Sequence, residues 1–344
     1  MHNTYSKPNR VEVIDFLKGF SIFTIVVYHL ISFYIGGIPN VIKTASQIGG
    51  TGVHVFLLCS GFGLFYSHLN KPLKTGEFIK KRLSKVYIPY VLVVFVSALL
   101  PFMYAGKDTI QALVSHVFLF KMFSENYVAS FGIQFWFVST IFQLYFVFNV
   151  LTKLKNKLGN KYFLAFCMMI SVGWWIVVSL AEKSDLRVWN SFFLQYLWEF
   201  GTGMVLADMY YHKKIKLDLN INKFVMLLIG LVCTGIYGYL GIVGGNFKIF
   251  NDIPALLGYG SLALFVYKLN INFLNKVFLW ISKFSYEWYL LHILVFEIVY
   301  RLLQNVLPSI LVGVFALVLS IGASYLYNKM FKFKFISKKE KALS

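Results

Sequence analysis

Apolar residues lie along this chain in long runs, and charged residues gather in the short stretches between them. A helix needs about 17 to 25 mostly apolar residues to cross about 30 Å of hydrocarbon. Ten segments of this kind predict membrane spans at 12–35, 51–68, 86–105, 130–152, 162–181, 191–211, 224–243, 252–268, 277–300 and 308–328. The tract 109–120 is apolar but short and contains His116, so we predict an interfacial helix there. The pattern predicts an all-α, polytopic membrane protein that forms one domain over residues 1–344.

Composition agrees with this class. Hydrophobic residues make up 58% of the 344 residues and charged residues 14%, with a mean hydropathy of +0.67. A soluble core could not hide so much apolar surface. The three cysteines lie in apolar spans at irregular spacing, and no His-x-x-x-His or Cys-x-x-Cys pair occurs. The sequence therefore predicts neither a disulfide framework nor a metal site.

The basic residues predict an orientation for the spans. Cytoplasmic loops of membrane proteins carry an excess of Lys and Arg. Ten spans with an internal N-terminus place 25 of the 33 basic residues on one side, so we expect both termini to be cytoplasmic. The formal net charge of +19 is explained by these loop residues beside anionic membrane lipid. It therefore gives no indication of a nucleic-acid partner.

The spacing of Lys18 and His29 in the first predicted span places both side chains on one face of a helix. Lys18 and His29 are eleven residues apart, which at 100° per residue places them within about 20° of each other and about 16 Å apart along the helix. Asp15 lies on the same face. A central Lys costs about 2.5 to 3.5 kcal/mol to insert, so such residues usually indicate function. The alternative is that Lys18 reaches the interface and His29 is only a packing residue.

Further polar residues occur in or beside the predicted spans. His54 and His292 lie well inside them, alongside Glu199 and Glu287, which indicates a polar interior. A neutral imidazole can accept and return a proton near neutral pH. Arg82 and Lys85 are three residues apart before the third span, where they could bind the phosphates of a nucleotide-like donor or merely satisfy the positive-inside rule.

Six fragments in order resemble the acyltransferase-3 family of integral membrane acyltransferases. The first is Asp15-Phe-Leu-Lys18-Gly19 followed by His29, where the family typically has Asp-x-Leu-Arg-Gly and then His. The others are Gly52 to Phe62, Arg82-x-x-Lys85 with Pro89-Tyr90, Phe135-Trp-Phe137 with Tyr145, Phe200 to Met204, and Phe284 to His292. Lys18 and Lys85 stand where the family usually has Arg, and Lys keeps the positive charge but lacks the planar guanidinium that forms two parallel hydrogen bonds.

This resemblance implies transfer of an acetyl group from acetyl-CoA to a hydroxyl of a surface glycan or lipid-linked saccharide, at a bacterial plasma membrane. It implies that His29 is the general base, with Asp15 and Lys18 fixing charge beside it. Arg82 and Lys85 would bind the CoA phosphates. Glu287, Tyr289 and His292 are candidates for the acceptor side. The competing hypothesis is a transporter or flippase for a lipid-linked saccharide, whose path buried charges would line.

Overall fold

The computed structural model describes residues 11–104, 106, 108–217 and 221–340, and every regular element in these ranges is helical. The longer helices are α1 (Glu12–Phe33), α3 (Gly52–Asn70), α5 (Ile88–Ala98), α7 (Trp136–Leu180), α9 (Leu197–Tyr211), α10 (Lys223–Val243), α11 (Asp252–Lys268), α13 (Ser285–Leu303) and α14 (Ser309–Glu340). The shorter ones are α2 (Asn40–Ser46), α4 (Thr75–Arg82), α6 (Thr109–Val117), α8 (Arg187–Asn190) and α12 (Asn272–Ile281). The predicted all-α fold is confirmed.

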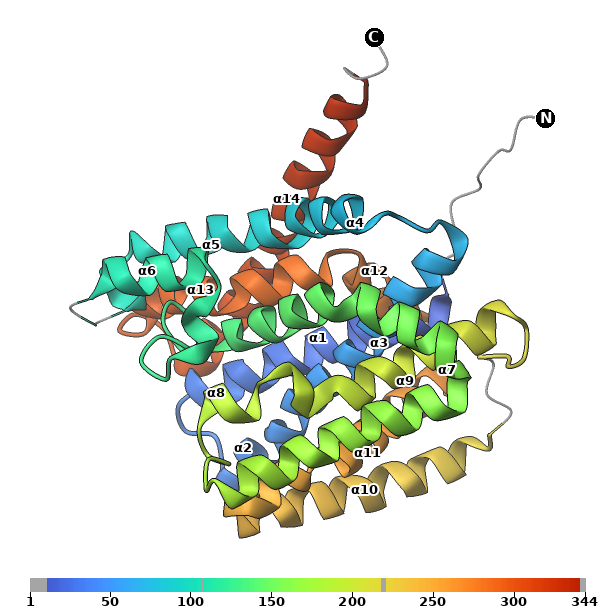
Figure 1. The fold of residues 1–344 in the computed structure, drawn as a ribbon. Coiled ribbons are helices and arrows are strands. Elements are labelled where there is room, and N and C mark those ends of the chain that lie inside the picture. The colour runs from blue at the N-terminus through green and yellow to red at the C-terminus, as the bar shows by residue number, and fades with distance from the viewer. Residues whose placement is uncertain (1–10, 105, 107, 218–220, 341–344) are drawn as a thin grey trace.

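Helix α1 lies in the middle of the bundle (Figure 1), where it contacts α3, α11, α12 and α13. Its first turn carries Glu12 and Asp15, whose charges favour the positive end of the helix dipole. Farther along, Phe16, Ile22 and Val26 are fully buried. The two halves of α1 border different cavities, so this helix positions the site.

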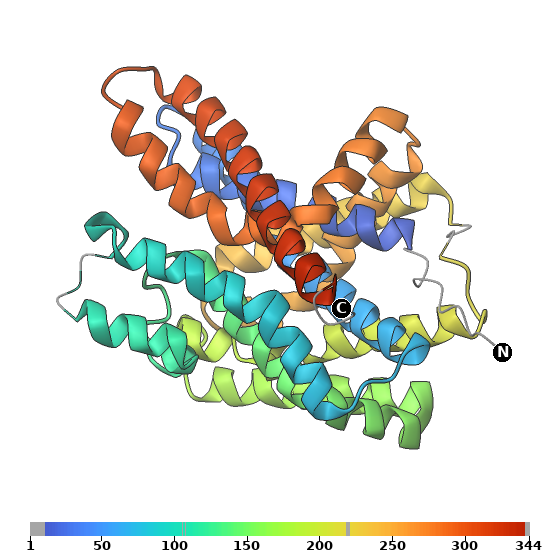
Figure 2. The same cartoon turned by 90° about the horizontal axis from the view of Figure 1, so that it is seen from above.

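Seen from above, α13 and α14 pack as a hairpin on one side of the molecule (Figure 2).

Within the described part of the chain, five helices are long and apolar enough to cross a membrane, judged by length and composition. They are α1, the continuous helical segment Asn40–Asn70 that ends with α3, α7, α10 and α14. Helix α7 covers two of the predicted spans, because Gly159 has φ 73° and the chain turns back there (Figure 1). Glycine tolerates this left-handed conformation without a Cβ clash. The number of ten spans and the cytoplasmic position of the termini stay predictions.

Several element boundaries differ from the expected ones. The segment predicted over 86–105 is helical in α5 only to Ala98, three residues before Pro101, whose ring disfavours helix in the residue that precedes it. The segment predicted over 277–300 is divided between α12 and α13 by a 3₁₀ turn at Ser282–Phe284. The short helix α6 lies within the tract 109–120 for which we predicted an interfacial helix.

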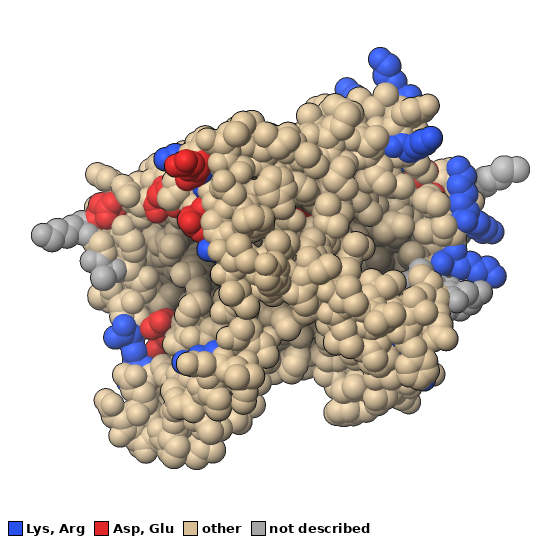
Figure 3. Space-filling view, turned by 90° about the horizontal axis from the view of Figure 1, so that it is seen from below, with Lys and Arg blue, Asp and Glu red and all other residues tan. Residues whose placement is uncertain are grey.

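Charged side chains are absent from a broad band of the surface shown in Figure 3. In that view one end of the molecule carries a cluster of Lys and Arg, whereas the other end carries most of the acidic side chains together with several basic ones. Helix α10 illustrates the apolar band, because only Met226 and Gly230 are buried along its 21 residues. An exposed surface of this kind is suited to contact with lipid chains.

Helices α3 and α9 pack so closely that two glycines are required at their contact. A Cβ added at Gly61 would lie 2.0 Å from the backbone oxygen of Phe200, and one added at Gly203 would lie 2.0 Å from that of Leu58. Small residues let helix backbones approach in this way. One turn before the second contact, the same faces bring His54 against Glu199. The glycine contact therefore sets the geometry of a buried polar pair.

We predict that Gly61→Val lowers the thermal stability of the detergent-purified protein by at least about 2 kcal/mol, since the new side chain overpacks a rigid backbone contact. Gly235→Ala on α10 is the matched control, because nothing lies within 4 Å of a Cβ added there. The measurement is the melting temperature of both variants. Equal melting temperatures would contradict the inferred contact.

Candidate active site

A cavity of about 420 Å³ opens beside the second half of α1, and we name it the His29 cavity. Its wall combines aromatic rings with hydroxyl, amide and imidazole groups from α1, α3 and the segment that leads into α9. The residues that line it are Ile25, Tyr28, His29, Phe33, Gln47, Gly50, Thr51, Val53, His54, Ile133, Trp136, Arg187, Tyr196, Tyr237 and Tyr289. Arg187 is the only Lys, Arg, Asp or Glu among these described lining residues.

The ring of His29 is held by a second histidine. His29 Nδ1 lies 2.8 Å from His292 Nε2, and His292 Nδ1 lies 3.0 Å from the backbone oxygen of Trp288. A carbonyl oxygen only accepts hydrogen bonds, so Nδ1 of His292 carries the hydrogen, and its Nε2 in the neutral ring is an acceptor. Nδ1 of His29 must then be the donor. The lone pair of a neutral His29 is therefore on Nε2, the arrangement that a general base requires.

A second histidine of the same cavity is paired with a carboxylate. His54 Nδ1 lies 2.7 Å from Glu199 Oε1, and Glu199 is fully buried. Asp252, the first residue of α11, completes a group of three whose ligand atoms all lie within 4.8 Å of one another. Gln195 Nε2 donates to Asp252 Oδ2 at 2.7 Å. The wall behind His54 is therefore a buried network of acidic and amide groups.

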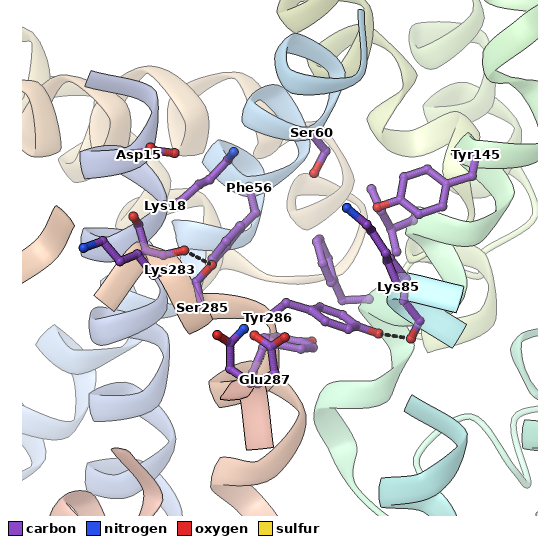
Figure 4. A pocket seen from close by; sticks show the side chains of 16 residues that line it. Asp15, Lys18, Phe56, Ser60, Lys85, Tyr145, Lys283, Ser285, Tyr286 and Glu287 are labelled. Carbon is purple, nitrogen blue, oxygen red and sulfur yellow. Dashed lines mark hydrogen bonds between the residues drawn. The ribbon is translucent and has the colours of Figure 1, made fainter. Parts of the chain in front are cut away.

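A second cavity, of about 370 Å³, borders the first half of α1, and we name it the Lys18 cavity. Its described lining residues are Asp15, Lys18, Phe56, Ser60, Lys85, Val86, Phe137, Ile141, Tyr145, Ser282, Lys283, Ser285, Tyr286, Glu287, Tyr289 and Asn328. Lys18 and Lys85 extend into the space from opposite walls, whereas the amino group of Lys283 points away (Figure 4). No residue that the structure describes forms an ion pair with Lys18 or Lys85. Two cations thus face a common space.

Tyr289 lines both cavities. Its ring packs against Phe137 with centroids 5.2 Å apart, and Phe137 in turn lies 6.2 Å from Phe56. The Tyr289 hydroxyl donates to the backbone oxygen of Gln134 and is thereby fixed. A layer of aromatic side chains therefore separates the two spaces, and one residue belongs to both.

The structure brings together most of the residues selected from the sequence. His29 and Lys18 border different cavities from one helix, and Asp15 and Lys85 lie with Lys18. His292 is buried behind His29 rather than exposed to its cavity. Their catalytic and binding roles stay predictions.

Two of the predicted residues lie away from where their expected roles would place them. Glu287 borders the Lys18 cavity and not the His29 cavity, although we expected it on the acceptor side. Arg82 does not line either cavity. Its guanidinium carbon lies 5.3 Å from the ring centroid of Phe78 and 5.7 Å from that of Tyr145, a cavity residue.

Burial lowers the pKa of the Lys85 amine, and the neighbouring Arg82 lowers it further.

Sequence reasoning missed Asp252 and Arg187. Asp252 begins an apolar helix and reads as a favourable first-turn acid, so nothing local indicates that it joins His54. Arg187 lies between two predicted spans, where its guanidinium carbon is 5.1 Å from the Trp136 ring centroid. Trp136 belongs to one of the family-like fragments, and through this contact that fragment is the signal in the sequence that pointed toward Arg187.

These features define a multi-pass helical membrane protein with a histidine-bearing cavity and a basic cavity. The model of the acyltransferase-3 family, described as an acyltransferase domain, matches residues 11–329, so the chain belongs to this family of membrane acyltransferases. The resemblance inferred from the six fragments is thereby confirmed. The Bacillus subtilis (strain 168) protein YfiQ, described as a candidate membrane-bound acyltransferase, is 21% identical over 318 residues, which cover 88% of this chain and 85% of YfiQ. No solved structure matches the chain.

We predict that His292→Phe reduces the kcat of acyl transfer by about 10²-fold or more, because His29 loses the acceptor that fixes its ring and tautomer. The KM for the acyl donor should stay close to the wild-type value, since His292 contacts neither cavity. Steady-state kinetics of the purified variant test this expectation. A large rise in KM with kcat unchanged would contradict the positioning role.

Proposed function

We propose that this acyltransferase moves an acetyl group from acetyl-CoA to a hydroxyl of a surface or lipid-linked saccharide at the bacterial plasma membrane. The observation that carries the proposal is the pair of cavities that meet at Tyr289. One holds the amino groups of Lys18 and Lys85, which suit a phosphorylated donor, and the other holds a histidine suited to activate a hydroxyl. Transfer across a membrane requires a donor site and an acceptor site on opposite sides of a barrier.

The Lys18 cavity has the chemistry of a donor site. Lys18 and Lys85 approach it from α1 and from the π-helical segment Leu83–Tyr87, and ammonium groups bind phosphate as point charges. The phosphates of acetyl-CoA would lie between them, while Arg82 supports the wall through the Tyr145 ring. The flexible arm of CoA would then direct its thioester toward Tyr289 and the His29 cavity. Asp15 beside Lys18 would limit the local excess of positive charge.

The His29 cavity has the chemistry of an acceptor site. Trp136 and Tyr196 offer ring faces, and Gln47 and Thr51 offer hydrogen-bonding groups, a combination that suits a sugar ring and its hydroxyls. His29 Nε2 would remove the proton of the acceptor hydroxyl as its oxygen attacks the thioester carbon. The carbon–sulfur bond then breaks, and the CoA thiolate takes up a proton that the imidazolium supplies. The products are the acetyl ester and CoA.

We predict that His29→Ala lowers transfer of label from acetyl-CoA to membrane saccharide by at least about 10²-fold, because the general base is removed. His68→Ala is the control, since the His68 ring stacks on Phe65 and borders neither cavity. Expression and melting temperature of both variants establish that they fold. Undiminished O-acetylation by well-folded His29→Ala would refute the mechanism.

Two measurements on the purified protein in proteoliposomes separate an acyltransferase from a transporter. Label that moves from acetyl-CoA to saccharide and depends on His29 supports acetyl transfer. Movement of saccharide across the proteoliposome membrane without consumption of acetyl-CoA would instead support a flippase and overturn the proposal.

Lys85→Gln is expected to raise the KM for acetyl-CoA by about 10-fold or more, since a hydrogen bond to a charged phosphate contributes about 1.5 to 3 kcal/mol. The kcat should change little, because Lys85 borders the Lys18 cavity and not the His29 cavity. Lys80→Gln is the matched control, a lysine of neighbouring α4 that lines neither cavity. An equal effect in both variants would show that general surface charge, rather than a binding site, is responsible.

A further inference from the structure

The structure places three potential metal ligands from three helices at the wall of the His29 cavity. His54 comes from α3, Glu199 from α9 and Asp252 from α11, and each offers a ligand atom within 4.8 Å of the other two. None of the three is more than 8% exposed. We propose that His54, Glu199 and Asp252 bind a divalent cation, of the class of Zn²⁺ or Mn²⁺, beside the acceptor cavity.

The hydrogen-bonding state of the cluster points to a missing positive partner. Glu199 Oε2 is buried and has no hydrogen-bond partner among the residues that the structure describes, and the same is true of Gln195 Oε1, whose amide nitrogen donates to Asp252. Both atoms are pure acceptors here, so another acceptor cannot satisfy them. Buried oxygens in this state favour a bound cation, because an unpaired buried polar group is destabilising.

The charge of the cluster leads to the same conclusion. Two ionised carboxylates with one imidazolium leave a net negative charge, and no described Lys or Arg lies within ion-pair distance of Glu199 or Asp252. A divalent cation on a neutral His54 and two carboxylates would balance the charge completely. One imidazole nitrogen with carboxylate oxygens is a donor set that Zn²⁺ and Mn²⁺ accept, whereas Mg²⁺ prefers oxygen alone.

The position of the cluster gives the cation a structural consequence. The three ligands come from helices that are distant in sequence, and His54 and Tyr196 carry the cluster to the cavity surface. The bound ion would join α3, α9 and α11 at the end of the bundle where the His29 cavity opens. Three protein ligands would leave further coordination positions for water.

The test uses the full-length protein in detergent, stripped with EDTA and then supplied with ZnCl₂ or MnCl₂ alone. We expect about one ion per chain by mass spectrometry after desalting, and a melting temperature that rises with metal concentration. Asp252→Asn should lose at least about 10-fold in affinity, because a ligand charge is removed while the shape is kept. Glu297→Gln is the control, since that carboxylate accepts a hydrogen bond from the hydroxyl of Tyr34, the residue that follows α1, and does not belong to the cluster.

Wild-type protein that holds no stoichiometric ion and shows no metal-dependent melting would overturn the proposal, and a shared proton would then balance the cluster. Equal binding by Asp252→Asn and wild type would also overturn it. Should Asp252→Asn not fold, the ion count on wild-type protein decides by itself. These readouts need neither acetyl-CoA nor an acceptor, so their failure leaves the proposed transfer reaction untouched.

Discussion

The requirement that polar groups inside an apolar helical bundle find partners governs this structure. Water is scarce at that depth, and an unsatisfied charge or hydrogen-bonding group is strongly destabilising there. The bundle meets this requirement by pairing histidines with groups on other helices: His29 with His292, and His54 with Glu199. Each pair fixes the relative position of two helices, so polar contacts specify the packing that apolar surface alone would leave loose. The histidines of these pairs are also the side chains best suited to proton transfer.

Helix α1 links this constraint to function. Lys18 and His29 do not meet, because they are eleven residues apart along the helix, and each instead borders a different cavity. The aromatic layer of Phe56, Phe137 and Tyr289 fills the space between. The proposed reaction would have to admit a charged donor and a polar acceptor without opening a continuous aqueous path. Two cavities that approach each other from opposite ends of one helix satisfy both demands.

The fold class and the first-span pair were predictable because they depend on local patterns: apolar run length, and the 100° rotation per residue that places Lys18 and His29 on one face. The partners were not predictable. His292 meets His29 across 263 residues of sequence, and Asp252 reaches His54 only because α11 begins beside α3. The helix break at Ser282–Phe284 was missed, because it lies inside one predicted span, 277–300, whereas the bend at Gly159 falls between two predicted spans.

A single residue, Tyr289, belongs to the walls of both cavities. In the proposed reaction its ring would therefore limit both the passage of water and the length of the acyl chain, and a substitution there would change the two properties together. A lineage that widened the opening for a bulkier acyl group would also admit more water to the thioester, so selectivity for short chains and resistance to wasteful hydrolysis would evolve together.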